Sequence, residues 1–324
     1  MCTCIKMKTK DSYFGRTLDL DYRFSEEVVI TPRKYQFNLK NGNTLNTKYA
    51  IIGMATVMDN VPLYAEAANE EGLAMAGLNF PNNCCLFKPQ DNKLNLAMYE
   101  LVPYFLGKYK SVKEIRDDLK LLNIIDTPFK EGVPNGQMHY MFSDKDESIV
   151  VEQTKDGLKV YDNPLNVMTN NPPFDYHLMN INNYLNLTPK VEETSFKKSL
   201  NLTPYGEGMG FIGLPGDNSP TSRLVRATFN LVNSKSDDDE VSSVTQFFHI
   251  LDSVSMVRGS TISKNNTYDL TTYTCCINLN KGIYYYKTYD NNQINAIRLL
   301  DENMNSKEIT RISLLEKQNI NYQN

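Results

Sequence analysis

The chain has 324 residues, of which 41 % are hydrophobic and 22 % are charged, a composition that supplies a substantial core and excludes a disordered protein. Its net charge of −4 at pH 7 and its pI near 5.6 argue against a nucleic-acid-binding surface. The first residues lack the apolar segment of a signal peptide, and no run of about 18 apolar residues is present, so we expect no membrane insertion.

The cysteines point to a reducing compartment. None of them has the CxxC spacing of a zinc or redox site, and neighbouring strand residues point to opposite faces, so adjacent cysteines cannot easily bridge each other. We therefore expect a cytoplasmic protein with six reduced thiols. These are Cys2, Cys4, Cys84, Cys85, Cys275 and Cys276.

The predicted elements begin with a β-hairpin. Side chains alternate over residues 2–7, Lys10-Asp11 has turn character, and residues 13–16 return as a second strand. Asn41-Gly42 predicts a turn between two later strands. The further strands predicted in this part of the chain are Glu27–Thr31, Tyr49–Val57 and Leu73–Asn79.

Helical periodicity follows in the next segment. Ser111 and Glu114 form a capping-box pattern, and apolar residues over 112–122 make one helical face. The preceding segment, Leu96–Leu106, is also predicted to be helical.

The rest of the chain alternates between strands and helices without an internal repeat or a linker. We predict strands at His139–Ser143, Ser148–Gln153 and Leu158–Tyr161, helices at Phe174–Leu185, Pro220–Val232 and Val241–Val257, and strands at Tyr268–Leu279, Ile283–Tyr289 and Gln293–Leu299. This order predicts an α+β fold in a single domain over residues 1–324, with two facing sheets and helices outside them.

Cys2 is the strongest candidate for a catalytic residue. Removal of Met1 would leave a thiol and a free α-amine on one residue. A cysteine thiol has an ordinary pKa of about 8.5 and an α-amine one of about 7.7–8.0, so the amine can accept the thiol proton and later protonate a leaving amine. A cysteine after the initiator is otherwise an ordinary strand residue.

Five other polar residues could support such a nucleophile. Arg16 would favour a thiolate, and Asp19 could hold the ammonium of the N-terminus, although the pair could equally be a turn salt bridge. Asn79 and Asn170 end predicted strands, where asparagine is usually a turn former but can also serve acyl transfer as an oxyanion donor. Arg223 opens a predicted helix and would otherwise pass as part of a solvated face.

Together these segments resemble the choloylglycine hydrolase family, and within it the bacterial bile salt hydrolases. Six blocks in the expected order, spread along nearly the whole chain, carry the resemblance. They are Met1-Cys2-Thr3, Phe14-Gly15-Arg16-Thr17-Leu18-Asp19, Ala76-Gly77-Leu78-Asn79-Phe80, residues 169–176 (TNNPPFDY), Gly213-Leu214-Pro215-Gly216-Asp217 and Ser222-Arg223.

The resemblance implies a four-layer αββα sandwich of the N-terminal-nucleophile type, with Met1 removed on maturation. It implies that Cys2 is both nucleophile and amine base, with Arg16 and Asp19 beside it. The oxyanion hole would comprise the N–H of Asn79 and the side chain of Asn170. Arg223 would complete the polar network; a homotetramer is also implied.

The implied substrate is the amide that joins a cholic-type steroid acid to glycine or taurine. Leu18 and Met138 would contribute to an apolar wall, framed by loops at Asp59–Tyr64 and Thr127–Gln137. For Met138, ordinary core packing is nearly as good an interpretation. Asn79 stands where penicillin V acylases commonly have tyrosine, which favours bile salts.

Alternative interpretations remain open at this level. The same chemistry could act on penicillin V or another N-acyl amide, and a protein that binds bile acids without turnover would share the cleft. A papain-like pairing with His139, His177 or His249 is disfavoured, because only Cys2 has a suggestive context. The mechanism requires no metal or other cofactor, and we expect none.

Overall fold

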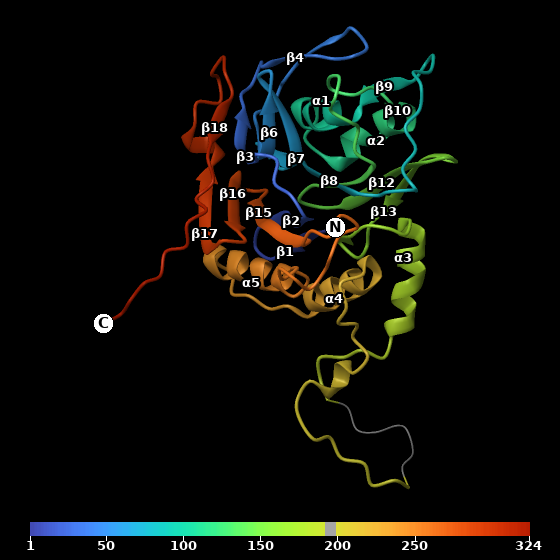
Figure 1. Cartoon of the computed structure of the whole chain (residues 1–324), viewed down its shortest axis with the longest axis vertical. Helices are drawn as coiled ribbons and strands as arrows, with labels where there is room; N and C mark the ends of the chain where they lie inside the picture. Colours follow the sequence, from blue (N-terminus) through green and yellow to red (C-terminus); the bar gives the residue numbers. More distant parts are fainter. Residues whose placement is uncertain (192–198) are drawn as a thin grey trace.

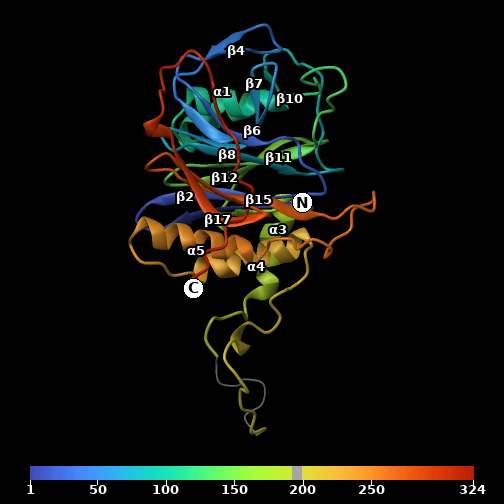
Figure 2. The ribbon, with the colours of Figure 1, turned by 60° about the vertical axis from the view of Figure 1, so that its left-hand side comes forward.

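The computed structural model describes residues 1–191 and 199–324, and two large antiparallel sheets stacked face to face dominate it (Figures 1 and 2). Within those residues, the first sheet has the strand order β14-β1-β2-β15-β16-β17. Its strands are β14 (Val167–Met168), β1 (Cys2–Lys8), β2 (Ser12–Leu20), β15 (Leu270–Asn278), β16 (Ile283–Thr288) and β17 (Asn291–Arg298).

The second sheet has the order β13-β12-β11-β8-β7-β6-β3-β18. Its strands are β13 (Gly157–Asp162), β12 (Ser148–Thr154), β11 (Met138–Ser143), β8 (Ala74–Asn79), β7 (Val61–Asn69), β6 (Ile51–Met58), β3 (Glu27–Thr31) and β18 (Thr310–Ile312). Two small ribbons lie outside the sheets: β4 (Gln36–Asn38) with β5 (Thr44–Asn46), and β9 (Leu94–Ala97) with β10 (Leu122–Ile125).

Helices cover the outer face of each sheet. Helices α4 (Pro220–Asn233) and α5 (Glu240–Asp252) pack on the first sheet, whereas α1 (Leu101–Lys108) and α2 (Val112–Leu121) pack on the second (Figures 1 and 2). The remaining helical segments are α3 (Phe174–Asn180), η1 (Met98–Glu100), η2 (Ile181–Tyr184), η3 (Met209–Phe211) and η4 (Leu299–Asp301). The four layers confirm the predicted α+β class and the αββα sandwich. In the described part of the chain, no helix has the length and apolar character needed to cross a membrane.

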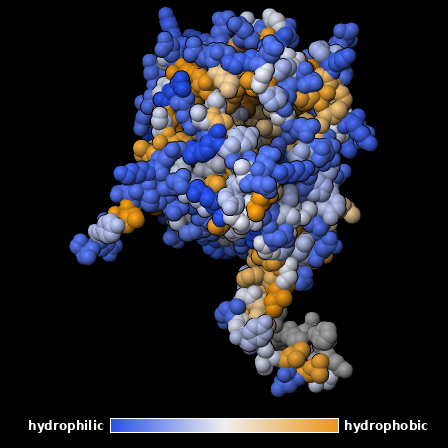
Figure 3. Space-filling view, in the orientation of Figure 1, coloured by the Kyte–Doolittle hydropathy of each residue, from blue (hydrophilic) through white to orange (hydrophobic). Residues whose placement is uncertain are grey.

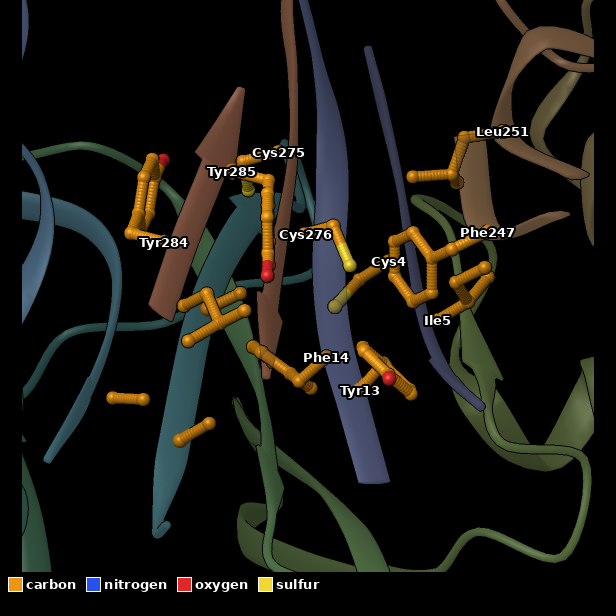
Figure 4. Packing of buried hydrophobic residues seen from close by; sticks show 14 of the residues in the cluster. Cys4, Ile5, Tyr13, Phe14, Phe247, Leu251, Cys275, Cys276, Tyr284 and Tyr285 are labelled. Carbon is orange, nitrogen blue, oxygen red and sulfur yellow. The ribbon is translucent and has the colours of Figure 1, made fainter. Parts of the chain in front are cut away.

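Apolar side chains fill the space between the layers in two clusters. One joins the two sheets to α4 and α5; Figure 4 shows Phe247 and Leu251 of α5 directed towards Ile5 of β1. The other lies between the second sheet and α1 and α2. Because β1 lies inside the first sheet, between β14 and β2, the N-terminus lies near the middle of the molecule (Figure 1).

Local sequence signals explain most of the helix starts. The side chain of Ser111 accepts a hydrogen bond from the N–H of Glu114, which confirms the predicted cap of α2. Helix α4 has Ser219 as its N-cap and Pro220 in its first turn, and Asp239 caps α5. The predicted hairpin is also confirmed, since β1 and β2 pair along their length.

Some predicted boundaries were wrong, and for the strands the pairing with neighbouring strands explains the difference. The segment Leu96–Leu106 was predicted as one helix, but its first residues form β9, whose backbone pairs in parallel with β10. The helices predicted at Phe174–Leu185 and Val241–Val257 end at Asn180 and Asp252. Strand β7 was not predicted at all; its regular pairing with β6 and β8 comes from tertiary contacts rather than from its own pattern.

Candidate active site

The thiol of Cys2 lies at the first residue of β1, directly opposite Leu18 of β2. Only 3 % of this residue is exposed, and it forms part of the floor of a cleft. Cys4 is paired with Arg16 two residues further along the strand, so the side chains of Arg16 and Cys2 lie on the same face near the start of β1. The hairpin therefore holds a thiol and a guanidinium together.

Arg16 contacts the sulfur directly. Its Nη2 lies 2.5 Å from Sγ of Cys2, and its Nη1 donates to the carbonyl of Gly77 on β8 at 2.6 Å. Burial alone would lower the pKa of Arg16, but Cys2, Tyr273 and Glu66 raise it overall, so the guanidinium keeps its charge. The geometry therefore places a positive charge against the sulfur.

The two predicted asparagines are joined by a hydrogen bond. Nδ2 of Asn170 donates to the carbonyl oxygen of Asn79 at 2.8 Å, and Oδ1 of Asn170 accepts from the backbone nitrogen of Cys2 at 2.8 Å. His177 supports this arrangement, because its Nε2 bonds the carbonyl of Asn170 at 3.0 Å. Burial lowers the pKa of His177, which favours the neutral ring that donates this bond.

Asn79 is the last residue of β8 and lines the cleft. Phe80 donates its N–H to Gln137, so ladder bonds alternate between β8 and β11 and leave the N–H of Asn79 pointing away from β11. The pairing of β8 with β7 has already ended at Ala76. This N–H is therefore not used by the ladder with β11, and Asn79 is one of the residues that line the cleft.

Arg223 lies in the first turn of α4 and is completely buried. Its Nη1 donates to the carbonyl of Cys2 at 2.5 Å and to Oγ1 of Thr3 at 2.6 Å, and its Nη2 donates to Oδ1 of Asn170 at 2.7 Å. Burial lowers the pKa of Arg223, while Asp19 and Cys2 oppose that effect. This arginine fixes the backbone of Cys2 and the amide of Asn170.

The side chain of Asp19 does not contact Cys2 in this structure. Its carboxylate accepts from the hydroxyl of Thr271 at 2.6 Å and from that of Thr17 at 3.2 Å. The backbone of Asp19 instead holds Met1: its N–H donates to the Met1 carbonyl at 2.8 Å, and its carbonyl accepts from the terminal amine. With Met1 attached, the nitrogen of Cys2 is an amide and not an amine.

The cleft above Cys2 is mainly apolar, with aromatic and methionine side chains among its lining residues, and it has a volume of about 360 Å³. In Figure 3 it is visible as an apolar hollow in the upper half of the molecule, in the region of β7 and α1. Leu18 and Met138 both line it, as do parts of the predicted Thr127–Gln137 loop. The other segment predicted as a framing loop, Asp59–Tyr64, contributes Leu63 and Tyr64, but these residues belong to strand β7. Its other apolar lining residues include Leu20, Phe24, Met58, Leu63, Met98, Val102 and Phe129.

His139, Cys84 and Cys85 are not among the residues that line the cleft. His139 bonds Glu152 at 2.9 Å and the carbonyl of Thr169 at 2.8 Å, and it stacks on Phe80. Cys84 and Cys85 are half-buried and do not line the cleft, and burial raises the pKa of Cys84. The described contacts offer no support for a papain-like pair.

Two contributors to the site carried no recognisable sequence signal. Thr271, on β15, bonds Asp19 across the first sheet. Glu66, on the unpredicted strand β7, lies 3.8 Å from Nε of Arg16. A glutamate between alanines resembles a surface residue, and only the stacking of the two sheets reveals it as buried.

The fold and the site together define an amide hydrolase with the architecture of N-terminal-nucleophile enzymes. Residues 2–312 match the model of the linear amide C–N hydrolases of the choloylglycine hydrolase family, and the chain belongs to this family.

Known relatives match over nearly the full length of the chain. A bile salt hydrolase/transferase of Lactiplantibacillus plantarum is 44 % identical over 95 % of both chains. The crystal structure of a mutant conjugated bile acid hydrolase from Clostridium perfringens is 42 % identical and superimposes with a TM-score of 0.92 over 100 % of both chains. The penicillin V acylase of Agrobacterium tumefaciens shares the fold, with a TM-score of 0.77 over 97 % of this chain and 91 % of its own at 18 % identity.

Proposed function

We propose that the protein hydrolyses the amide bond of glycine- and taurine-conjugated bile salts and uses Cys2 as its nucleophile. The observation that carries this proposal is the position of the Cys2 thiol, in contact with Arg16, at the floor of an apolar cleft. Such a cleft suits a steroid body, while the charged glycine or taurine end can stay near water. The names of the L. plantarum and C. perfringens relatives support this substrate class.

In the proposed reaction, Met1 is first removed and the freed amine of Cys2 takes the thiol proton. Sγ then attacks the carbonyl carbon of the substrate, and the N–H of Asn79 and the second Nδ2 hydrogen of Asn170 would receive the oxyanion. The amine returns its proton to the leaving glycine or taurine nitrogen as the C–N bond breaks. Water then hydrolyses the thioester and releases the bile acid and the free thiol.

The supporting residues have separate roles in this scheme. Arg16 would stabilise the thiolate, and Arg223 would hold the Cys2 carbonyl and the Asn170 amide in place. We propose that Asp19 orients the new N-terminus after the Met1 contacts to its backbone are lost. Leu18 and Met138 would contact the steroid.

The test is release of glycine and taurine from glycocholate and taurocholate, with penicillin V as the competing substrate and intact mass to confirm loss of Met1. Faster turnover of the bile salts is the expected result. Preferred turnover of penicillin V would make the protein an acylase of that type. Tight binding of bile salts without product, by protein that lacks Met1, would instead indicate a non-catalytic binding protein.

A second candidate activity is transfer of the acyl group to another amine. The L. plantarum relative is named a hydrolase/transferase, and a thioester can be attacked by an amine in place of water. The amine nitrogen would bond to the acyl carbon, and the thiol would leave with the amine proton. Mass spectrometry after incubation of taurocholate with excess glycine would detect the exchanged conjugate.

We also propose a cytoplasmic homotetramer. Residues 181–191 and 199–212 extend away from the sheets as an arm (Figures 1 and 2), and the arm exposes large apolar side chains. Leu185 is 85 % exposed and Tyr205 is 88 % exposed. Several large exposed apolar side chains on one segment are typical of a surface that another subunit covers.

A further inference from the structure

Glu66 is a carboxylate enclosed between the two sheets. It projects from β7, and its exposed fraction is 0 %. Oε2 accepts a hydrogen bond from the hydroxyl of Tyr273 at 2.7 Å, and Oε1 accepts one from Tyr284 at 2.6 Å. Both tyrosines belong to the facing sheet, so side chains from β7, β15 and β16 meet at this carboxylate.

Arg16 is the cation that faces this carboxylate. Its Nε lies 3.8 Å from Oε2 of Glu66, and both side chains are buried. The opposite end of the same guanidinium contacts Sγ of Cys2, and Nη1 is tied to the carbonyl of Gly77. Glu66, Arg16 and Cys2 therefore form one continuous chain of contacts from the interior to the cleft.

Among the titratable groups of the described residues around Glu66, Arg16 is the one that carries a charge near pH 7. Burial raises the pKa of Glu66 overall, and Arg16 and the two tyrosine hydroxyls oppose only part of that effect. Burial also raises the pKa values of the neighbouring hydroxyl and thiol groups, so these groups stay neutral near pH 7. They belong to Tyr273, Tyr284, Cys275 and Cys4. A buried guanidinium without a counter-charge is costly, and it would relax away from its present position.

We propose that Glu66, held by Tyr273 and Tyr284, is a positioning residue that keeps the Arg16 guanidinium against the sulfur of Cys2. The proposal rests on the amide hydrolysis proposed above. Glu66 does not line the cleft, so it acts through Arg16 and not on the substrate. Its loss should weaken formation of the thiolate and leave substrate binding nearly intact.

The test uses the Glu66→Gln variant lacking Met1, with two readouts. For glycocholate, kcat should fall by about 10- to 100-fold while KM changes by less than about threefold. For Cys2 itself, the pH at which iodoacetamide alkylation is half-maximal, followed on the N-terminal peptide by mass spectrometry, should move upwards. Glu66→Asp, which keeps the charge, should retain more activity than Glu66→Gln.

The neighbouring tyrosines supply a second variant and a control. Tyr284 and Tyr285 lie on opposite sides of β16 (Figure 4), and the Tyr285 hydroxyl bonds Glu240 on α5. The double variant Tyr273→Phe/Tyr284→Phe should shift the alkylation profile in the same direction as Glu66→Gln. If Glu66→Gln does not fold, this double variant is the test of the proposal. Tyr285→Phe should leave the profile unchanged.

An unchanged alkylation profile in a folded Glu66→Gln protein would overturn the proposal and leave Glu66 a purely structural residue. A shift to lower pH would also overturn it, because Glu66 would then merely repel the thiolate. If the parent protein releases no glycine but the upward shift persists, the proposed substrate is wrong and the role of Glu66 stands.

Discussion

The polar groups next to Cys2 form a buried network in which each side chain restrains another. Arg16 is 1 % exposed, Arg223 is 0 % exposed and Asn170 is 4 % exposed, so water screens their contacts very little. Removing one partner from such a network leaves a buried charge or amide unsatisfied, which costs more than loss of a surface contact. Substitutions here should therefore affect both activity and stability, and activity tests need matched controls.

Replacement of the nucleophile is the most direct test at this scale. Cys2→Ser should lower kcat for glycocholate by at least about 10³-fold, because a serine hydroxyl is far less ionised than a thiol at neutral pH. Free glycine measures the rate, and intact mass confirms that Met1 has been removed from both proteins. A serine variant within about tenfold of the parent rate would rule out a thiol mechanism.

Asn170 provides a second test, with its sequence neighbour as the control. Asn170→Ala removes the amide that bonds both Cys2 and Asn79, and kcat should fall by about 10²- to 10³-fold, as expected for loss of an oxyanion donor. Asn171 instead donates to the carbonyl of Pro81, so Asn171→Ala should change kcat little. Equal losses in the two variants would indicate a general disturbance of this loop.

At the scale of elements, the hairpin of β1 and β2 was predictable because its signals are local. Alternation, the turn at Lys10-Asp11 and the returning strand all lie close together at the start of the chain. Strands β7 and β9 were missed because their pairing partners, and not their own patterns, decide their conformation. Glu66 was missed for the same reason, whereas Cys2, Arg16 and Arg223 were found through the family resemblance and lie together in the structure.

The contact between β2 and β15 leads to a prediction about stability. A Cβ added at Gly15 would lie 2.1 Å from the carbonyl oxygen of Cys275, and the backbone there cannot easily move. Gly15→Ala should therefore lower the free energy of unfolding by about 3 kcal/mol or more, measured by urea denaturation. Gly206→Ala, where the added Cβ meets nothing within 4 Å, is the control and should be close to neutral. A Gly15→Ala protein as stable as this control would show that the two strands can separate freely.

At the scale of the whole molecule, the sandwich brings together distant parts of the chain at one point. Cys2 comes from the N-terminus, Asn79 from the second sheet, Asn170 from the end of β14 and Arg223 from α4. Local sequence patterns could not predict this convergence, because it depends on how the sheets stack. The arm is the exception to this compactness, since its apolar residues face solvent in the single chain.

The exposed apolar arm yields the last prediction. If other subunits cover it, the parent protein should have about four times the 37.1 kDa chain mass by light scattering. Leu202→Asp/Tyr205→Asp places charges at positions that are 50 % and 88 % exposed in the single chain, and it should dissociate the assembly because burying unpaired carboxylates is costly. Leu300→Asp, on η4 and also 60 % exposed, is the matched control and should leave the mass unchanged. A parent protein with the mass of one chain would contradict the tetramer, and dissociation by Leu300→Asp alone would place the interface away from the arm.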